Sequence, residues 1–182
     1  MNKKRLLLHS CCAPCVPVPL ERLQSDYDVT CFFYNPNIHP EEEYLKRLIE
    51  LKNLAKLLKI ENLAAEYDSE RWFELVKDLE NEPEGGKRCA VCFKMRLHET
   101  VKFAKQQGFD IFTTTLTISP HKNAILINQI GSELGDQNNI KFLEANFKKK
   151  NGYRRSIELS KLYNLYRQNY CGCIYSQREK QK

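Results

Sequence analysis

The sequence predicts an α/β protein built on one mostly parallel, Rossmann-like sheet with helices on both faces. Short apolar runs alternate along the chain with longer segments of helical periodicity, which favours parallel strands joined by crossover helices. No repeat, low-complexity segment or linker divides the 182 residues, a length that buries a core without disulfide bonds. We therefore expect a single domain over residues 1–182.

The first half of the chain predicts three strands, each followed by a helix. The strands are the apolar or β-branched runs RLLLHS, DVTCFFY and NLAAEY. Prolines keep the turn after the first run irregular, so its helix begins near Val18. The second helix starts at Pro40, carries acidic residues in its first turn and runs to about Lys59. Asp68 or Ser69 caps the third helix.

The second half predicts two more strands and three more helices. A helix over about 89–107 ends before Gly108, a common C-terminal stop. The run DIFTTTL is a fourth strand, and KFLEA is a short fifth strand after a helix that ends near Gly135. The last predicted helix covers about 155–169.

The segments HSCCAPC, NPNIHP and TTTLTISPHK all follow predicted strands directly. The functional crevice of a parallel sheet lies beyond the carboxyl ends of its strands, so we expect these segments to share one edge. We expect a metallocluster bound by the cysteines of the first segment to lie at that edge.

Hydropathy argues against a membrane protein. No apolar run approaches the ~20 residues that span a bilayer, and the apolar stretch 6–8 is well short of a signal-peptide core. We expect a cytoplasmic protein with no membrane partner. In that reducing compartment, eight cysteines are more typical of metal binding or catalysis than of a disulfide framework.

Seven of the eight cysteines form three groups, and Cys31 alone is expected to be a core residue. The groups are Cys11, Cys12 and Cys15; Cys89 and Cys92; and Cys171 and Cys173. A structural zinc site needs only four thiolates, and adjacent cysteines do not resemble a zinc knuckle. A C-x-x-C redox centre explains each group separately but not all three together.

An iron–sulfur cluster is the third interpretation, and its four candidate ligands are Cys11, Cys12, Cys89 and Cys92. A loop that leaves a strand can turn two consecutive side chains toward one cluster. The second pair lies three residues apart near a helix start, where the dipole favours thiolate. The thiols left over either ligate a second metal ion or form a redox dithiol beside the cluster; they are Cys15, Cys171 and Cys173.

The basic segment FKKKNGYRRS, residues 147–156, carries five of the positive charges in a chain of net charge +6. Two aromatic residues lie among these charges, a composition suited to phosphate contact and base stacking. A solvated surface loop would have a similar composition.

Six ordered blocks carry a specific resemblance: HSCCAPC, YNPNIHPEEEYLKR, RCAVCFKMRL, TTTLTISPHKN, FKKKNGYRRSIELS and LYRQNYCGCIYS. In these blocks, spread over nearly the whole chain, the sequence resembles the cobalamin-independent epoxyqueuosine reductases of the tRNA queuosine pathway, formerly a family of unknown function. The resemblance implies reduction of the epoxide of epoxyqueuosine, at the wobble position of tRNA, to the cyclopentene of queuosine. It also implies an electron donor that the sequence does not identify.

The resemblance implies roles for the cysteines. Cys11, Cys12, Cys89 and Cys92 match the ligands of the [4Fe–4S] cluster. Cys171 and Cys173 match a redox-active pair that is either a disulfide or a set of ligands to a second metal ion, iron, which would act as a Lewis acid. Cys15 joins this pair as a catalytic candidate.

Other polar residues are expected to bind the substrate or the tRNA backbone, although local hydrogen bonding would explain the histidines and asparagines equally well. The candidates are Tyr34, Asn35, Asn37, His39, His121, Lys122, Arg154, Arg155 and Arg167. Two other classes stay open: a zinc-stabilised RNA-binding module without redox activity, and a thiol–disulfide oxidoreductase that acts on proteins.

Overall fold

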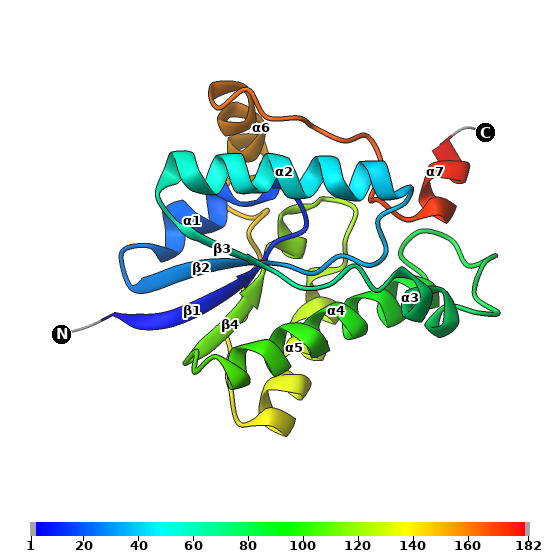
Figure 1. Ribbon diagram of the computed structural model, residues 1–182, viewed down its shortest axis with the longest axis horizontal. Coiled ribbons are helices and arrows are strands. Elements are labelled where there is room, and N and C mark those ends of the chain that lie inside the picture. The colour runs from blue at the N-terminus through cyan, green and yellow to red at the C-terminus, as the bar shows by residue number, and fades with distance from the viewer. Residues whose placement is uncertain (1–2, 181–182) are drawn as a thin grey trace.

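The computed structural model describes residues 3–180, with side chains described as far as residue 177. These residues contain a five-stranded sheet in the order β3-β2-β1-β4-β5, and every neighbouring pair is parallel (Figure 1). The predicted fold class is confirmed. The strands are β1 (Lys4–His9), β2 (Tyr27–Phe33), β3 (Glu61–Ala64), β4 (Ile111–Thr114) and β5 (Lys141–Phe142).

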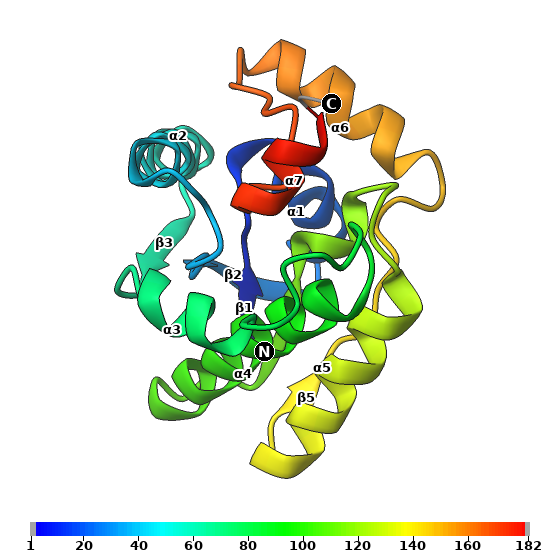
Figure 2. The same cartoon turned by 90° about the vertical axis from the view of Figure 1, so that its right-hand side faces the viewer.

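Helices cover both faces of this sheet (Figure 1). One face packs against α1 (Pro17–Leu23), α2 (Glu41–Leu58) and α6 (Gly152–Leu162). The other face packs against α3 (Ser69–Leu75), α4 (Lys87–Gln106) and α5 (Ala124–Asn138). Figure 2 looks onto the carboxyl ends of the strands and shows the short helix α7 (Ile174–Lys180) in front of them. Among the described residues, none of the helices combines the length and apolar character needed to cross a bilayer.

The core forms around β1, the central strand. Leu6 and Leu8 point into one helical layer and Leu7 into the other, and all three are fully buried. This near-continuous apolar run is typical of a parallel strand covered on both faces. Cys31 on β2 is also fully buried, which confirms it as a core residue.

The strand order reverses between β1 and β4, because the chain adds β2 and β3 on one side of β1 and later places β4 and β5 on the other. A crevice opens at such a reversal, outside the carboxyl ends of the two strands. The first cysteine segment and the TTTLTISPHK loop therefore face each other across this crevice.

Several predicted elements end earlier than expected. The runs NLAAEY and KFLEA leave the sheet after Ala64 and Phe142. The run DIFTTTL leaves the sheet after Thr114, because the Thr114 hydroxyl accepts a hydrogen bond from the Leu116 N–H and starts a 3₁₀ turn over Thr115–Ile118. The last predicted helix stops at Leu162, and the chain turns at Asn164, whose positive φ of 51° asparagine tolerates well. The chain then continues as an extended segment into α7, a helix that the sequence analysis did not predict.

Candidate functional site

Three thiols meet directly after the carboxyl end of β1; they are named here the first thiol group. The Sγ atoms of Cys11, Cys12 and Cys15 lie within 4.8 Å of one another, with Cys11–Cys12 at 3.7 Å and Cys12–Cys15 at 2.9 Å. Pro14 favours a 3₁₀ turn in which the Cys15 N–H donates to the Cys12 carbonyl, and this turn returns Cys15 to Cys12. The Cys11 N–H donates to the Thr115 hydroxyl at 3.2 Å, which fixes the loop to the segment after β4.

The close approach of these thiols makes their ionisation unequal. Hydrogen bonds from Cys12 and Cys15, with Lys122 and Arg96 nearby, hold the pKa of Cys11 well below its usual range. The hydrogen bond to Cys11 raises the pKa of Cys12 to about 12. Three adjacent thiolates repel one another unless a cation lies between them, and a metal ion supplies that charge. The group therefore fits a metal centre with thiolate ligands.

Four more thiols, the second thiol group, line a small neighbouring cavity. Cys89 and Cys92 lie at the start of α4, and the C-terminal segment brings Cys171 and Cys173 to the same cavity. A hydrogen bond from Cys173 and the charge of Lys122 lower the pKa of Cys171 to about 5. All eight cysteines of the chain are free thiols in this structure, so the two of the C-terminal pair are not joined in a disulfide.

A larger cavity of about 410 Å³ adjoins both thiol groups. Cys11 and Cys15 line it, and Cys171 lines both this cavity and the smaller one. The remaining walls come from the loop after β4, from α6 and from the C-terminal segment; they include Ser119, His121, Lys122, Tyr153, Ser156 and Arg167. The cavity lies in the crevice where parallel α/β sheets bind their ligands.

The four predicted cluster ligands come from both groups: Cys11 and Cys12 from the first, and Cys89 and Cys92 from the second. The thiol that lies nearest Cys12 is Cys15, which the sequence analysis left outside the ligand set. All seven clustered cysteines nevertheless line this one region at the carboxyl edge of the strands.

Buried arginines add positive charge around the thiols. Arg47, Arg88 and Arg96 are each no more than 2% exposed. Arg96 Nη1 lies 4.0 Å from Cys92 Sγ, and Nη2 donates a 2.5 Å hydrogen bond to Asn35 Oδ1. Among the described residues, no carboxylate lies within ion-pair distance of Arg96. A buried cation of this kind favours anionic ligands nearby, such as metal-bound thiolates.

Of the two predicted asparagines, Asn37 lines the smaller cavity and Asn35 contacts Arg96 in its wall. Asn35 Nδ2 donates to the Ser10 carbonyl at 3.0 Å, so its amide joins the end of β1 to Arg96. Asn37 is buried and lines the smaller cavity, and its Oδ1 has no hydrogen-bond partner among the described residues. Tyr34 is buried, and its hydroxyl has no hydrogen-bond partner within the part of the chain that the structure describes. Asn37 is therefore the member of this set best placed to bind a ligand.

The histidines at the strand ends differ in their surroundings. Both ring nitrogens of His9 have partners, with Nδ1 2.8 Å from Thr114 Oγ1 and Nε2 3.2 Å from the Tyr34 carbonyl. Burial lowers the pKa of His9 to about 3, which keeps the ring neutral. His9 therefore shapes the strand ends through local hydrogen bonds. His121, in contrast, is exposed and lines the larger cavity beside Lys122.

His39 lies outside the lining of both cavities and gives the fold a pH dependence. Its ring stacks on Phe73 with centroids 4.6 Å apart, and burial lowers its pKa from 6.5 to about 4.

The stability that the neutral His39 ring contributes is fully present above pH 6.5, and the free energy of unfolding is expected to fall as the pH drops from 6.5 toward 4. His39→Phe keeps a ring but binds no proton, so it should flatten this decline in urea titrations. An equally steep decline in the variant would assign the pH dependence to other groups.

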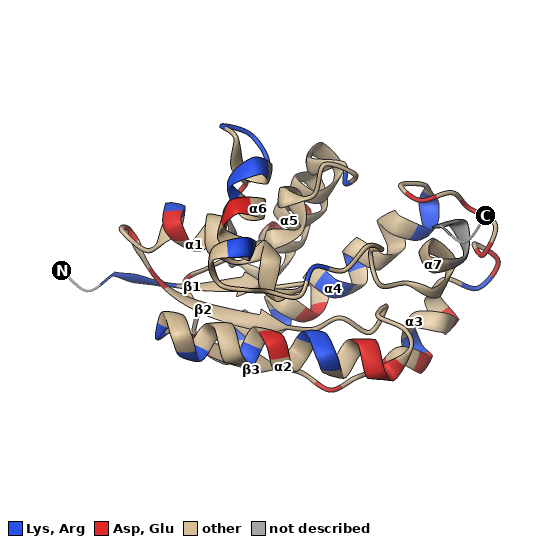
Figure 3. Ribbon diagram, turned by 90° about the horizontal axis from the view of Figure 1, so that it is seen from above, with Lys and Arg blue, Asp and Glu red and all other residues tan. Residues whose placement is uncertain are grey.

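The basic segment lies on the loop before α6 and on α6 itself (Figure 3). Arg154 has an 83% exposed side chain that is ion-paired with Glu158 on the same helix. Arg155 is ion-paired with Glu21 at 2.8 Å, and Lys148 Nζ donates to the Lys122 carbonyl. These side chains therefore differ in how free they are to contact a phosphate.

Arg167 is predicted to contact the tRNA backbone and lies in the wall of the larger cavity. Its Nη1 donates to Ser160 Oγ at 3.0 Å and to the Ser156 carbonyl at 3.4 Å. These bonds hold the guanidinium of Arg167 against α6, although the residue as a whole is exposed to solvent.

A comparison with known families identifies the family of this chain. A model of the family described as epoxyqueuosine reductase QueH matches residues 6–179. The chain belongs to the epoxyqueuosine reductase QueH family. This membership confirms the resemblance seen in the six sequence blocks, and it makes the chain an oxidoreductase.

Named members of the QueH family are similar over most of their length. The Staphylococcus epidermidis epoxyqueuosine reductase QueH is 43% identical over 96% of this chain and 77% of that protein. The Thermotoga maritima protein of the same name is 37% identical over 97% of this chain and 92% of that protein. The U34-tRNA thiolase NcsA from Methanococcus maripaludis, solved with its [4Fe-4S] cluster, shares the fold. Its TM-score is 0.61 at 12% identity, over 97% of this chain and 62% of that one.

Three buried arginines beside the thiols were missed at the sequence level: Arg47, Arg88 and Arg96. Arg96 follows Cys92 by four residues on a helix, a spacing that places both side chains on one face and was a usable signal. Arg47 is also buried but acts on residues more than a hundred positions away, and the sequence gives no signal for such a contact.

Proposed function

We propose that this chain reduces the epoxide of epoxyqueuosine in tRNA to the alkene of queuosine, with electrons delivered through an iron–sulfur cluster. The reaction takes up two electrons and two protons and releases the epoxide oxygen as water. The observation that supports this most strongly is the convergence of two thiol groups on two adjoining cavities at the switch point of the sheet, with Cys171 lining both cavities. Because the substrate is tRNA, we place the activity in the cytoplasm.

We assign a [4Fe–4S] cluster to Cys11, Cys12, Cys89 and Cys92. Two of these thiols lie in the loop after the central strand, which a hydrogen bond to Thr115 fixes, and two lie near the start of α4, where Arg96 supplies positive charge beside Cys92. When bound, such a cluster is a source of low-potential electrons. The catalytic thiols are then Cys15, Cys171 and Cys173, as a dithiol or as ligands of a second metal ion, iron.

The larger cavity is proposed to receive the modified nucleoside. Its volume of about 410 Å³ falls within the range typical of small-molecule sites, and three thiols line it. Lys122 lines this cavity, and its charge acts on Cys11 and Cys171, so its ammonium is proposed to donate a hydrogen bond to the epoxide oxygen. His121 beside it is a second hydrogen-bonding group at the same wall. Bases of a single-stranded RNA loop are splayed out readily enough to enter such a cavity.

The exposed cations before and on α6 are proposed to contact tRNA phosphates. Changing Lys149, Lys150 and Arg154 together to Ala should weaken binding and reduce the salt slope by roughly 0.7–0.9 for each lost contact. The same change at Lys52, an exposed residue of α2, is the matched control and should leave the slope unaltered. The measurement is tRNA affinity at several salt concentrations. If Lys148 and Arg155 are also changed and the slope still equals that of the wild type, the segment is only a solvated loop.

Metal analysis separates the proposal from the two other classes. Anaerobically purified protein should be brown and contain iron and acid-labile sulfide in equal amounts, about four of each per chain. A zinc-stabilised RNA-binding module would be colourless and contain zinc. A protein thiol oxidoreductase would turn over a protein substrate without RNA. Either of the last two outcomes contradicts the proposed chemistry.

A further inference from the structure

The C-terminal segment, residues 163–173, carries Cys171 to the thiol site without regular secondary structure of its own. Backbone contacts hold its far end to the loop before α2. The His39 N–H donates to the Gly172 carbonyl at 2.8 Å, and the Tyr170 hydroxyl donates to the His39 carbonyl at 2.6 Å. Because the segment has no helix or strand ladder of its own, side-chain contacts with the neighbouring helices hold it, such as the bond from the Tyr166 N–H to the Glu50 carboxylate at 2.9 Å.

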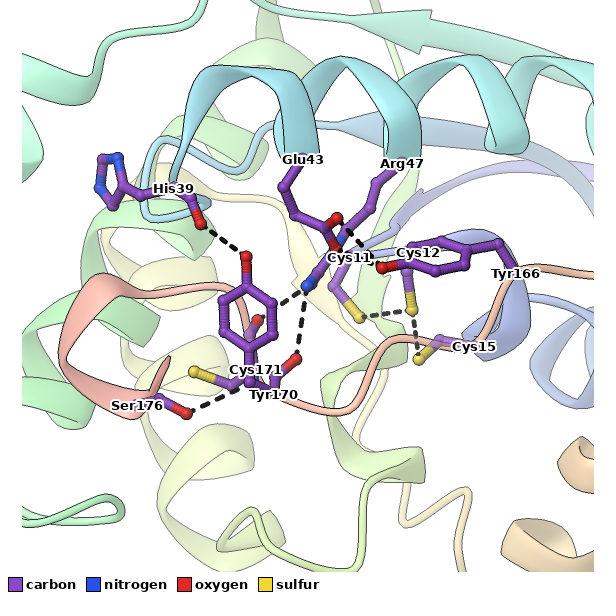
Figure 4. A network of polar contacts seen from close by, with 10 residues as sticks. All are labelled: Cys11, Cys12, Cys15, His39, Glu43, Arg47, Tyr166, Tyr170, Cys171 and Ser176. Carbon is purple, nitrogen blue, oxygen red and sulfur yellow. Dashed lines mark hydrogen bonds and ion pairs between the residues drawn. The ribbon is translucent and has the colours of Figure 1, made fainter. Parts of the chain in front are cut away.

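Arg47 of α2 holds the far end of this segment (Figure 4). Its side chain is 1% exposed. Nη1 donates to the Cys171 carbonyl at 3.1 Å and Nη2 to the Tyr170 carbonyl at 3.4 Å, so one guanidinium spans two consecutive carbonyls. Figure 4 shows the guanidinium reaching from the helix toward these carbonyls, near Cys11 and Cys12. A lysine cannot reproduce this forked geometry with a single ammonium group.

Two side chains fix the guanidinium in turn. Glu43, one turn earlier on α2, accepts from Arg47 Nε at 2.7 Å, and the same carboxylate accepts from the Tyr166 hydroxyl at 3.1 Å. The segment is therefore tied to α2 at both ends, by Tyr166 and by the carbonyls that Arg47 holds. Packing at the far end is tight, because a Cβ on Gly172 would lie 3.1 Å from Arg47 Nη1.

We propose that Arg47 is a positioning residue for the Cys171-Gly172-Cys173 thiols, held in place by Glu43 and Tyr166. It touches no sulfur directly; it acts by fixing the backbone from which both thiols project, and so keeps Cys171 where the two cavities meet. The inference rests on the proposed function in that these thiols take part in the reduction.

Hydrogen exchange tests this positioning independently of turnover. In the anaerobic holoprotein, Arg47→Lys is expected to speed amide exchange in peptides covering 166–173 and in the His39 amide by at least tenfold. Exchange in β1 and α4 should stay within twofold of the wild type. Single-turnover reduction should fall at least tenfold while the KM for tRNA changes less than twofold, because Arg47 lines neither cavity. Lys52→Arg, on the exposed face of the same helix, is the matched control and should change none of these values.

Tyr166→Phe covers the case in which Arg47 variants fail to fold, since it removes only a hydroxyl. It should also speed amide exchange locally but by a smaller factor, about threefold in residues 166–173. Wild-type exchange in that segment, in folded Arg47→Lys or in Tyr166→Phe, would overturn the proposal. Faster exchange with unchanged turnover would show that Arg47 holds the segment but that its thiols do not take part in the reduction.

Discussion

Cys171→Ala and Cys173→Ala are each expected to give a folded, brown protein that no longer reduces epoxyqueuosine in tRNA. Cys171 lines both cavities and lies beside Lys122, and Cys173 lines the smaller cavity. Neither is among the four assigned cluster ligands, so the cluster should remain. The single-turnover rate should fall by at least about a thousandfold, which corresponds to about 4 kcal/mol in the barrier. Removal of one sulfur should cost about 1 kcal/mol of stability.

Melting temperature, cluster absorbance and single-turnover reduction should be measured on the same preparations. Cys31→Ala is the matched control, because this thiol is fully buried on β2 and lies away from both cavities. That variant should lose stability and keep its turnover rate when folded. Wild-type turnover in either C-terminal variant would remove the pair from the mechanism.

Loss of any assigned cluster ligand is expected to bleach the visible charge-transfer absorption and abolish turnover. Single Ala substitutions at Cys11, Cys12, Cys89 and Cys92 each remove one of four thiolates, and a cluster with three ligands and a partly open site is easily lost. Iron content should fall by more than half in each variant, while tRNA affinity should change less than threefold.

Cys15→Ala is the informative comparison, because Cys15 lies 2.9 Å from Cys12 and belongs to the first thiol group. The assignment expects this variant to stay brown and lose turnover. Bleaching at Cys15 with colour retained at Cys89 or Cys92 would move the ligand set to the first thiol group. Full colour in all four assigned variants would refute the set as a whole.

The sheet and most of its helices could be predicted because the sequence signals are local. The consecutive leucines on β1 and the β-branched residues of the run that ends at Thr114 each indicate a strand from the local sequence alone. The ends of elements depended on side-chain hydrogen bonds that compete with the backbone ladder, as at Thr114, or on a single positive φ, as at Asn164. Periodicity does not report such contacts.

The thiols of the site could be found from the sequence, but their grouping could not. Cys15 returns to Cys12 through a 3₁₀ turn that residue spacing alone does not specify. The C-terminal pair reaches Cys89 and Cys92 because Arg47, far away in sequence, holds the connecting segment. Contacts between distant residues come from the packed fold, so a sequence pattern predicts the ingredients of the site better than its arrangement.

Single-turnover reduction of tRNA that carries epoxyqueuosine tests the central claim most directly. The protein is mixed with this tRNA under anaerobic conditions with excess chemical reductant, because the reaction takes two electrons and a [4Fe–4S] cluster passes on one at a time. The nucleosides released by digestion are identified by mass spectrometry. We expect conversion to queuosine, a nucleoside lighter by one oxygen atom, and no conversion by protein from which the cluster has been removed. A protein with intact cluster and tRNA binding that leaves the epoxide unchanged would contradict the central claim.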